Sequence, residues 1–424
     1  MSVPWKLACV RCDRTYEGMA TRYRCDCGGT LDVIHEHTSV PTLAEFDQRR
    51  ASNDPLNRSG VWRFRELVLP LASEFIVTRG EGNTTLYDHP GPAKYAGVDR
   101  FRLKHEGENP TASFKDRGMT AAVSAAKQLG MRAVACASTG NTSASMASYA
   151  AFAGMDAYVF IPEGKIAYGK LSQALAYGGK TIQIRGDFDR AMELVQQVCD
   201  SEGIYLVNSV NPFRIEGQKA IGLELLQDCG WQVPDWIALP GGNLGNNTAL
   251  AKGLIEAFEL GLIDKLPRLA VIQAAGANPL YTAWSQGSDE LVPVKAKTIA
   301  TAIQIGNPVS FRKSLRGIAR LDGVVAQVTD QEILDAKAHV DASGIGAEPA
   351  SCATVAGVKK LVAAGVIPAD ANICGVLTGH LLKDPDVVVN YHRSELQGFD
   401  STYANPPVVT DATLQAVLAV VRAQ

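Results

Sequence analysis

Lys115 is the residue of this chain best placed to do covalent chemistry. It stands in residues 108–118, where Pro110 disfavours helix before it and Ser113 with Asp116 forms a capping-box pattern. We therefore expect a helix to begin here, with Lys115 in its first turn. The positive end of a helix and partial burial both disfavour an ammonium ion and favour the neutral amine. Since a neutral amine attacks an aldehyde, Lys115 is a candidate Schiff-base lysine.

Residues 138–143, Ser-Thr-Gly-Asn-Thr-Ser, form a polar loop between an apolar segment and a stretch rich in alanine and serine. Hydroxyls and backbone N–H groups at the start of a helix can hold an anion without a formal positive charge. Ordinary helix capping is the competing interpretation of the same residues. The loop is a candidate anion site that needs support from the rest of the chain.

A glycine-rich loop at residues 241–247, Gly-Gly-Asn-Leu-Gly-Asn-Asn, follows the apolar segment 236–239 and precedes a helix-like stretch. Glycines let successive N–H groups point inward, and the helix that follows adds its positive end. The loop is no Walker motif, because Gly-Lys-Ser/Thr is absent, and no dinucleotide fingerprint, because G-x-G-x-x-G is absent. It predicts a phosphate cradle of another kind.

Two further strings follow apolar segments. Residues 208–219 contain Arg214, whose guanidinium fork suits a phosphate group, although a surface ion pair would be the ordinary role of a single arginine. Residues 377–385 contain Thr378 and His380. His380 is a possible base, but one histidine beside a strand end is more often structural.

The segments that must position these residues alternate between two types. Those that predict strands are residues 133–136, 157–161, 181–184, 205–207, 236–239, 269–273 and 373–377. Helical stretches such as 143–153 and 189–202 lie between them. This alternation predicts an α/β fold with open parallel sheets and helices on both faces, in two lobes. Ligands of such sheets bind at the carboxyl ends of the strands, so we expect the loops to surround a shared cleft.

These strings resemble the threonine synthase family, which comprises pyridoxal-phosphate enzymes of the tryptophan synthase β-like fold (fold type II). Matches run in the same order from Gly82-Asn83-Thr84-Thr85-Leu86 to His380, over about the last five sixths of the chain. The resemblance implies two parallel-sheet lobes behind a small N-terminal zinc-ribbon-like knuckle. The expected divisions are residues 1–40 for the knuckle, 41–108 for an arm and the first part of the large lobe, 109–214 for the small lobe, and 215–424 for the rest of the large lobe.

The resemblance also implies individual roles. Lys115 would carry pyridoxal 5'-phosphate and serve as the catalytic base. Cofactor contacts would come from Asn141 at the ring hydroxyl oxygen, from Gly242, Asn243, Leu244, Gly245 and Asn246 at the phosphate, and from Thr378 at the pyridine nitrogen. The substrate's carboxylate and phosphate would be held by Ser138, Thr139, Thr142, Ser143, Asn208 and Arg214.

The activity implied is that of a lyase that forms L-threonine and phosphate from O-phospho-L-homoserine and water. Ala112 and Leu381 depart from the family's frequent glycines, which leaves room for a reshaped pocket. The alternatives are a related cofactor-dependent enzyme, such as cysteate synthase or threonine dehydratase, and a zinc-dependent interaction protein that has lost catalysis. A comparison of phosphate release from phosphohomoserine with that from phosphoserine would distinguish these enzyme activities.

Four of the nine cysteines cluster near the N-terminus, as Cys9 with Cys12 and Cys25 with Cys27. Two close thiolate pairs on tight turns can close a tetrahedral shell around zinc, and metal binding would then supply much of the stability of so small a module. Reduced cysteines in a loose tail are the alternative. We expect a structural zinc rather than a nucleic-acid module, because few basic residues surround the cluster.

Composition limits the range of partners. The chain has 424 residues, 46% of them hydrophobic, a formal net charge of −3 and a sequence pI of about 6.2. Such a chain has no basic field for nucleic acid or for an anionic membrane, and we expect a small-molecule substrate. The N-terminal residues lack an apolar signal core, which predicts a cytoplasmic protein. A homodimer is expected by analogy with the family.

Overall fold

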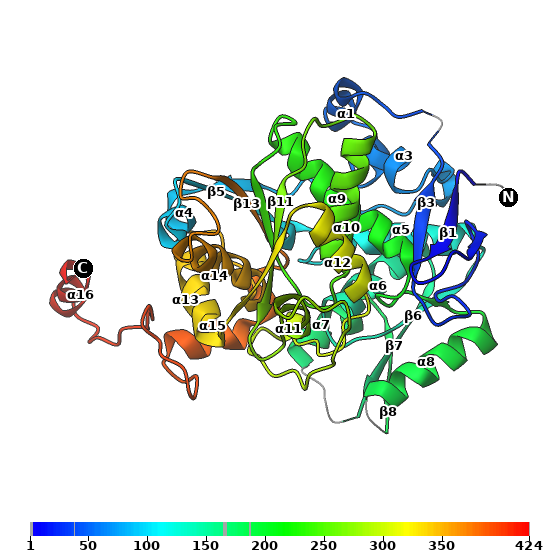
Figure 1. Cartoon of the computed structure of the whole chain (residues 1–424). Coiled ribbons are helices and arrows are strands. Elements are labelled where there is room, and N and C mark those ends of the chain that lie inside the picture. The colour runs from blue at the N-terminus through cyan, green and yellow to red at the C-terminus, as the bar shows by residue number, and fades with distance from the viewer. Residues whose placement is uncertain (1–2, 38, 164–167, 186–187, 424) are drawn as a thin grey trace.

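Two parallel-sheet lobes make up most of the computed structural model, which describes residues 3–37, 39–163, 168–185 and 188–423 (Figure 1). The smaller sheet has the strand order β8-β7-β6-β9 and is entirely parallel. Its strands are β6 (Ala133–Ala137), β7 (Asp156–Pro162), β8 (Lys180–Ile184) and β9 (Tyr205–Leu206). The helices that accompany it are α5 (Lys115–Gln128), α6 (Asn141–Ala153), α7 (Tyr168–Ala176) and α8 (Phe188–Glu202).

The larger sheet has the order β12-β11-β10-β13-β5-β4, with only the edge strand β4 antiparallel. Its strands are β4 (Leu86–Asp88), β5 (Arg100–His105), β10 (Trp236–Pro240), β11 (Arg268–Ala274), β12 (Val324–Val328) and β13 (Asn372–Leu377). Its main helices are α4 (Pro90–Ala96), α9 (Pro212–Asp228), α10 (Gly245–Glu259), α12 (Phe311–Arg320), α13 (Asp330–Ala342) and α14 (Pro349–Ala363).

Alternate residues of the central strands enter two separate hydrophobic cores. In β10, Ile237 and Leu239 pack with residues of α9, α10 and α12, whereas Trp236 and Ala238 pack with residues of α4, α13 and α14. Successive side chains of a strand point to opposite faces, so a strand covered on both sides is apolar throughout. The expected fold of parallel sheets with helices on both faces is confirmed.

Each of the seven segments expected to be strands overlaps an observed strand, but β4, β5 and β12 of the larger sheet were not expected. In β5 four of the six residues are basic, which hides the strand pattern. Lys104 of β5 is nevertheless fully buried, because its ammonium lies 2.7 Å from Glu224 and 2.6 Å from Asp228. Buried charges persist only when they are paired in this way.

Residues 43–75 form a series of short helices. They are α1 (Leu43–Arg50), α2 (Pro55–Arg58), η1 (Trp62–Phe64), α3 (Arg65–Val68) and η2 (Ser73–Phe75). Trp62 and Phe64 are fully buried, and the indole N–H of Trp62 donates to Thr120 of α5 at 2.8 Å. This part of the chain therefore supports the helix that begins at Lys115.

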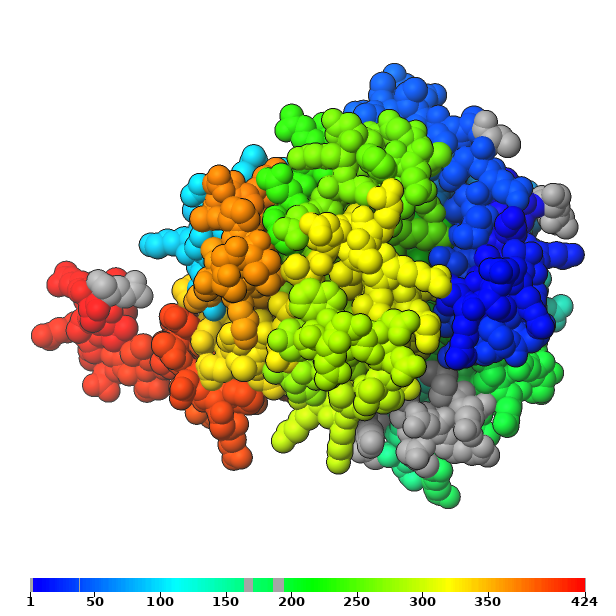
Figure 2. Space-filling model, viewed as in Figure 1, coloured from blue at the N-terminus to red at the C-terminus, as the bar shows by residue number. Residues whose placement is uncertain are grey.

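The N-terminal module is a three-stranded antiparallel sheet, with β1 (Trp5–Cys9) between β2 (Thr15–Glu17) and β3 (Leu31–His35). It packs on the body at the right of Figure 2, in dark blue. Buried Glu216 of α9 joins the two parts, because it accepts from His35 of β3 at 2.7 Å and pairs with Lys219 and Lys252 at 2.5 Å each. The Lys219 ammonium also lies 2.6 Å from Glu256. The two carboxylates, Glu216 and Glu256, therefore share a cation supplied by the protein itself.

After α15 (Pro385–His392) the chain leaves the body and ends in α16 (Leu414–Arg422), which projects from it in Figures 1 and 2. Among the described helices, none combines the length and apolar character needed to cross a lipid bilayer.

Candidate active site

A cavity of about 800 Å³ lies where the strand-end loops of the two sheets face each other. The residues from the expected site that line it are Lys115, Ser138, Thr139, Asn141, Thr142, Asn208, Arg214, Gly242, Asn243, Leu244, Gly245, Asn246 and Thr378. Ser143 is the exception, because it is buried and its hydroxyl donates to the carbonyl oxygen of Gly140 at 2.8 Å. Segments far apart in sequence thus meet at the carboxyl ends of the parallel strands, where such sheets bind their ligands.

Lys115 is the first residue of α5, as expected, and its amine faces the cavity. Burial lowers the pKa of Lys115 to about 7, and the nearby positive charge of Arg214 acts in the same direction, while the Glu348 carboxylate opposes both. The amine also lies 4.0 Å from the ring centre of Phe114. A large share of Lys115 is therefore neutral near pH 7, which a nucleophilic lysine requires.

The predicted capping box at Ser113 and Asp116 is wrong. Phe114 precedes the helix and no side chain caps it, while the Ser113 hydroxyl is buried without a partner among the described residues. Asp116 instead accepts from the backbone N–H and the hydroxyl of Thr111, at 2.6 and 2.5 Å, and from the hydroxyl of Ser145 at 2.5 Å. Burial raises the pKa of Asp116 to about 6. The carboxyl closes the loop before Lys115 rather than capping the helix.

Backbone hydrogen bonds tie the Lys115 loop to the loop after β13. The N–H of Phe114 donates to the carbonyl oxygen of Thr378 at 3.0 Å, and the N–H of His380 donates to that of Ala112 at 3.1 Å. Ala112 has a φ of +63°, a left-handed conformation that costs a non-glycine residue about 1–2 kcal/mol. The glycine frequent here in the resembling family would avoid that cost.

The glycine-rich loop has the form of an anion cradle. Leu244, which precedes α10, has a φ of +63°, and no side chain caps the helix. A Cβ atom on Gly242 would lie 3.0 Å from Cα of Ile303, so only glycine fits without a shift. Both polar side-chain atoms of Asn246 are buried without a partner among the described residues. A buried, unpaired amide is costly unless a ligand satisfies it, so these residues fit a phosphate group.

Thr378 belongs to a buried polar cluster that the sequence did not reveal. Its hydroxyl lies 3.0 Å from the Ser351 hydroxyl and donates to Glu348 Oε1 at 3.1 Å. Asn141 donates from Nδ2 to Glu348 Oε2 at 3.1 Å. Glu348 and Ser351 lie at the start of α14, which no motif marked as functional. The sequence offered one hint of Glu348, namely a glutamate directly before a proline and a helix that starts with small residues.

Two further cationic side chains line the cavity. Arg214 is buried, its Nη1 donates to the carbonyl oxygen of Val207 at 3.1 Å, and its Nε has no partner among the described residues. Burial lowers the pKa of Arg214 to about 10. Lys383, which sequence reasoning missed, also lines the cavity and donates to the side chain of Gln173 in α7. These two side chains can meet an anionic substrate.

Two expected residues already have structural partners. Asn208 accepts from the N–H of Ala137 at 2.9 Å and donates to its carbonyl oxygen at 3.1 Å, so its side chain extends the pairing of β6 with β9 beyond the end of β9. His380 accepts from the N–H of Leu382 at 3.2 Å through Nδ1, and burial lowers the pKa of its imidazole. His380 therefore caps η5 (Leu381–Lys383), in agreement with its structural interpretation.

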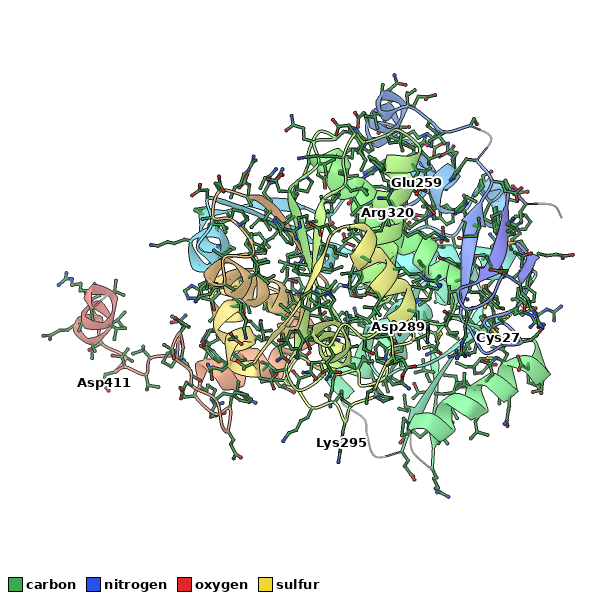
Figure 3. All side chains as sticks on the ribbon, viewed as in Figure 1. Cys27, Glu259, Asp289, Lys295, Arg320 and Asp411 are labelled. Carbon is green, nitrogen blue, oxygen red and sulfur yellow. The ribbon has the colours of Figure 1, made fainter. Side chains whose placement is uncertain are left out.

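The four N-terminal cysteines converge as expected of a metal site. Their sulfur atoms lie within 4.8 Å of one another, with Cys9 and Cys12 at 3.5 Å from Cys27 and Cys12 at 3.6 Å from Cys25. Figure 3 labels Cys27 in this module, at the right. A Cβ atom on Gly29 would lie 2.7 Å from the sulfur of Cys9, so the second turn requires glycine. Four converging thiols fit a tetrahedral zinc ion.

Comparison with known proteins defines the class. The model of the family described as pyridoxal-phosphate dependent enzymes matches residues 77–379. Threonine synthase of Methanocaldococcus jannaschii is 45% identical over 384 residues, which cover 90% of this chain and 93% of that protein. Threonine synthase of Methanosarcina acetivorans is 44% identical over 416 residues, 97% and 98% of the two chains. The structure of threonine synthase from Escherichia coli aligns with a TM-score of 0.67 at 18% identity, over 99% of this chain and all of that one.

The chain therefore belongs to the family of pyridoxal-phosphate dependent enzymes. Within that family it belongs with the threonine synthases, which match it along nearly its whole length. The resemblance drawn from the sequence strings is confirmed, as is the expectation of a lyase dependent on this cofactor. Because identity to the Escherichia coli structure is low, that comparison supports the fold alone.

Proposed function

We propose that this protein converts O-phospho-L-homoserine and water into L-threonine and phosphate. The observation that carries the proposal is the full-length match to threonine synthases, together with a lysine of lowered pKa inside a cavity lined by two anion-binding loops. One loop suits the phosphate of a cofactor and the other suits an acidic substrate. An enzyme acting on a phosphorylated amino acid needs both.

The residues that would hold pyridoxal phosphate divide by chemistry. The cradle from Gly242 to Asn246 would take its phosphate, Asn141 its ring oxygen and Thr378 its ring nitrogen, with Lys115 as the attachment point. When bound, the cofactor supplies an electron-withdrawing ring that acidifies the C–H bonds of an attached amino acid. The Thr378 hydroxyl is a neutral partner, so it leaves a ring nitrogen less protonated than a carboxylate partner would.

Lys115 is the proposed proton carrier. With a pKa of about 7, its Nζ can accept a proton at neutral pH and give it back, as efficient general acid–base catalysis requires. It would remove the Cα proton and then a Cβ proton of the substrate, and protonation at Cγ would follow departure of phosphate. Addition of water then places the hydroxyl group on Cβ and a proton back on Cα, which completes threonine. Phe114 beside the amine and the buried loop before it restrict the position of Nζ.

Substrate anions would be held by cationic and polar side chains of the cavity lining. We assign the phosphate of the substrate to Arg214, because its Nε is a donor without a partner among the described residues. Ser138, Thr139 and Thr142 would hold the carboxylate through hydroxyl and N–H groups. Asn208 would act mainly by holding the strand end in place, and Ser143 by fixing the turn at Gly140.

The deciding experiment supplies purified protein and pyridoxal phosphate with O-phosphohomoserine and quantifies both threonine and inorganic phosphate. Equal amounts of the two products are expected. O-phosphoserine serves as the comparison substrate, with sulfite added in a parallel reaction. Phosphate release without threonine, or faster release from phosphoserine, would redirect the assignment toward an elimination or sulfite-dependent activity.

We further infer a structural zinc at the four cysteines, a cytoplasmic location and a homodimer. The mass in solution should be about twice the 45.2 kDa of one chain, as measured by light scattering. A net charge of −3 supports a small-molecule substrate over nucleic acid or an anionic membrane.

A further inference from the structure

Glu348 touches two of the proposed cofactor contacts at once. It directly precedes α14 and its side chain is buried. Its Oε2 accepts from Asn141, at the start of α6 in the small lobe, and its Oε1 accepts from Thr378, after β13 in the large lobe, at 3.1 Å each. A single carboxyl therefore links the residue assigned to the ring oxygen with the residue assigned to the ring nitrogen.

The backbone holds this carboxyl rigidly against the Thr378 loop. The N–H of Glu348 donates to the carbonyl oxygen of Gly379 at 3.0 Å, and Ser351 Oγ accepts from the N–H groups of Thr378 and Gly379 at 2.8 and 3.0 Å. A Cβ atom on Gly379 would lie 2.5 Å from Cδ of Glu348. The glycine is needed because the carboxyl packs directly onto it.

We propose that Glu348 is a positioning residue that directs the hydroxyl proton of Thr378 toward the ring nitrogen of bound pyridoxal phosphate. The inference deepens the proposed function, on whose cofactor site it rests. The question is which of Glu348 and Thr378 donates the hydrogen bond between them. The inference rests on the distances among Glu348, Thr378 and Ser351.

Counting protons shows why Glu348 decides that direction. A threonine hydroxyl donates one hydrogen bond, and an ionised carboxylate can only accept. If Glu348 is ionised, it takes the Thr378 proton and leaves only lone pairs toward the ring nitrogen. If Glu348 instead carries a proton on Oε1, the same 3.1 Å contact runs in the other direction, with Glu348 donating to Thr378 Oγ1. The Thr378 proton is then free to bind an unprotonated ring nitrogen. The neutral acid is thus the form that makes Thr378 a donor.

The surroundings favour the neutral form of Glu348. The charged groups around it are Lys115 of α5, Lys383 of η5 and Asp384 at the start of α15. Neither lysine forms an ion pair with it within 4.0 Å among the described residues, where Lys383 donates to Gln173 instead. Burial raises the pKa of Glu348 and the charge of Asp384 raises it further, while the hydrogen bonds from Asn141 and Thr378 and the charge of Lys383 only partly offset this. A buried carboxylate without a cationic partner is costly, which agrees with protonation.

Glu348→Gln is the sharpest test, because the amide can accept from Asn141 and donate to Thr378 as the neutral acid does. Cofactor-loaded Glu348→Gln should match the wild type in absorbance spectrum at pH 7 and in affinity for pyridoxal phosphate. Glu348→Met, which removes both hydrogen bonds, should weaken that affinity about tenfold and shift the absorbance maximum. Glu332→Gln is the control, since Glu332 of α13 is partly exposed and pairs at 3.3 Å with Lys360 of α14, the helix that Glu348 precedes.

A second measurement isolates the route through Thr378. When Glu348→Met is added to Thr378→Val, the affinity for the cofactor should fall less than about twofold below that of Thr378→Val alone, and the absorbance maximum should stay where it is. Residues that act through one another do not have additive effects. Between pH 5 and 9 the wild-type spectrum should change in a step that Glu348→Gln lacks. Three results would overturn the proposal. Glu348→Gln, still folded by circular dichroism, could lose the cofactor as Glu348→Met does, or its spectrum could change with pH as that of the wild type does. The third is that the effects of the Glu348 and Thr378 substitutions simply add. None of these measurements uses substrate, so a failure to form threonine would count against the proposed function alone.

Discussion

The guanidinium of Arg214 and the amine of Lys115 face the same cavity, and the charge of Arg214 adds to burial in lowering the pKa of Lys115 to about 7. Two positive charges close together disfavour each other, so the guanidinium favours the neutral form of the nearby amine. Arg214 would bind the phosphate of the substrate and also keep Lys115 ready to react. This coupling leads to the first prediction.

Arg214→Met should raise the pKa of Lys115, because it removes a neighbouring positive charge. Capture of pyridoxal phosphate by the apoprotein needs the neutral amine, so its rate should rise with pH through about 7 in the wild type and at higher pH in the variant. Stopped-flow absorbance measures this without substrate. Arg320→Met, at the far end of α12 beside Phe258 and labelled in Figure 3, is the control and should leave the profile unchanged. Equal profiles for Arg214→Met and wild type would contradict the coupling.

Lys115 should be the attachment point of the cofactor. Borohydride treatment of loaded protein, followed by peptide mass mapping, should find the pyridoxyl group on Lys115, and Lys115→Ala should lose both the label and at least about 10²-fold of activity, the usual contribution of a positioned acid–base group. Lys127→Ala, in the last turn of the same helix, should keep both. A label on another lysine would refute this assignment.

Gly379→Ala should destabilise the protein by about 1–3 kcal/mol, since overpacking forces neighbouring atoms to move. The added methyl would meet the Glu348 carboxyl at 2.5–2.7 Å. Gly140→Ala is the matched control in the other lobe, because its methyl would meet no atom within 4 Å. Denaturant unfolding gives the difference, and equal losses in both variants would contradict the packing argument.

Glu216→Gln should cost about 3–5 kcal/mol, the usual loss when one partner of a buried ion pair is removed. Fully buried Lys219 and largely buried Lys252 would both lose their nearest carboxylate. These lysines hold the pKa of Glu216 well below its usual range, so its contribution to stability is present above the unfolded pKa and is lost as pH falls through the folded pKa. Glu36→Gln removes an exposed pair with Lys6 at 3.9 Å and should cost less than about 1 kcal/mol. Urea unfolding at pH 7 tests the two stability losses, and a series of unfolding curves from about pH 6 down to about pH 2 tests the pH dependence.

Metal analysis should find one zinc per chain, and Cys12→Ser should lose it, because three remaining thiols no longer close a tetrahedral shell. Cys199→Ser, a buried cysteine of α8 outside the cluster, should retain the metal. Removal of zinc by a chelator should lower the thermal midpoint of the protein, since metal binding contributes to folding. A protein that binds no zinc when purified in its presence would contradict this prediction.

The sequence was informative wherever a local pattern carried the signal. The start of α5 at Lys115 and the placement of each polar loop after a strand could be predicted, because proline, glycine and apolar runs act on neighbouring residues. Glu348 could not be found in this way, since its partner Asn141 is 207 residues away in the sequence. The strand β5 was hidden because Lys104 is paired by carboxylates of a helix that lies more than a hundred residues further along. The fold could therefore be predicted more fully than the network of buried charges within it.

Helix α9 carries Arg214 in its first turn, and Glu216 follows two residues later. The same turn of helix thus presents one side chain to the cavity and another to the N-terminal module. A single helical turn is too stiff for these two ends to move independently. The N-terminal module therefore holds the start of α9 in place through the contact between His35 and Glu216. A change that loosens this module should also displace the guanidinium of Arg214, which we propose binds the substrate phosphate.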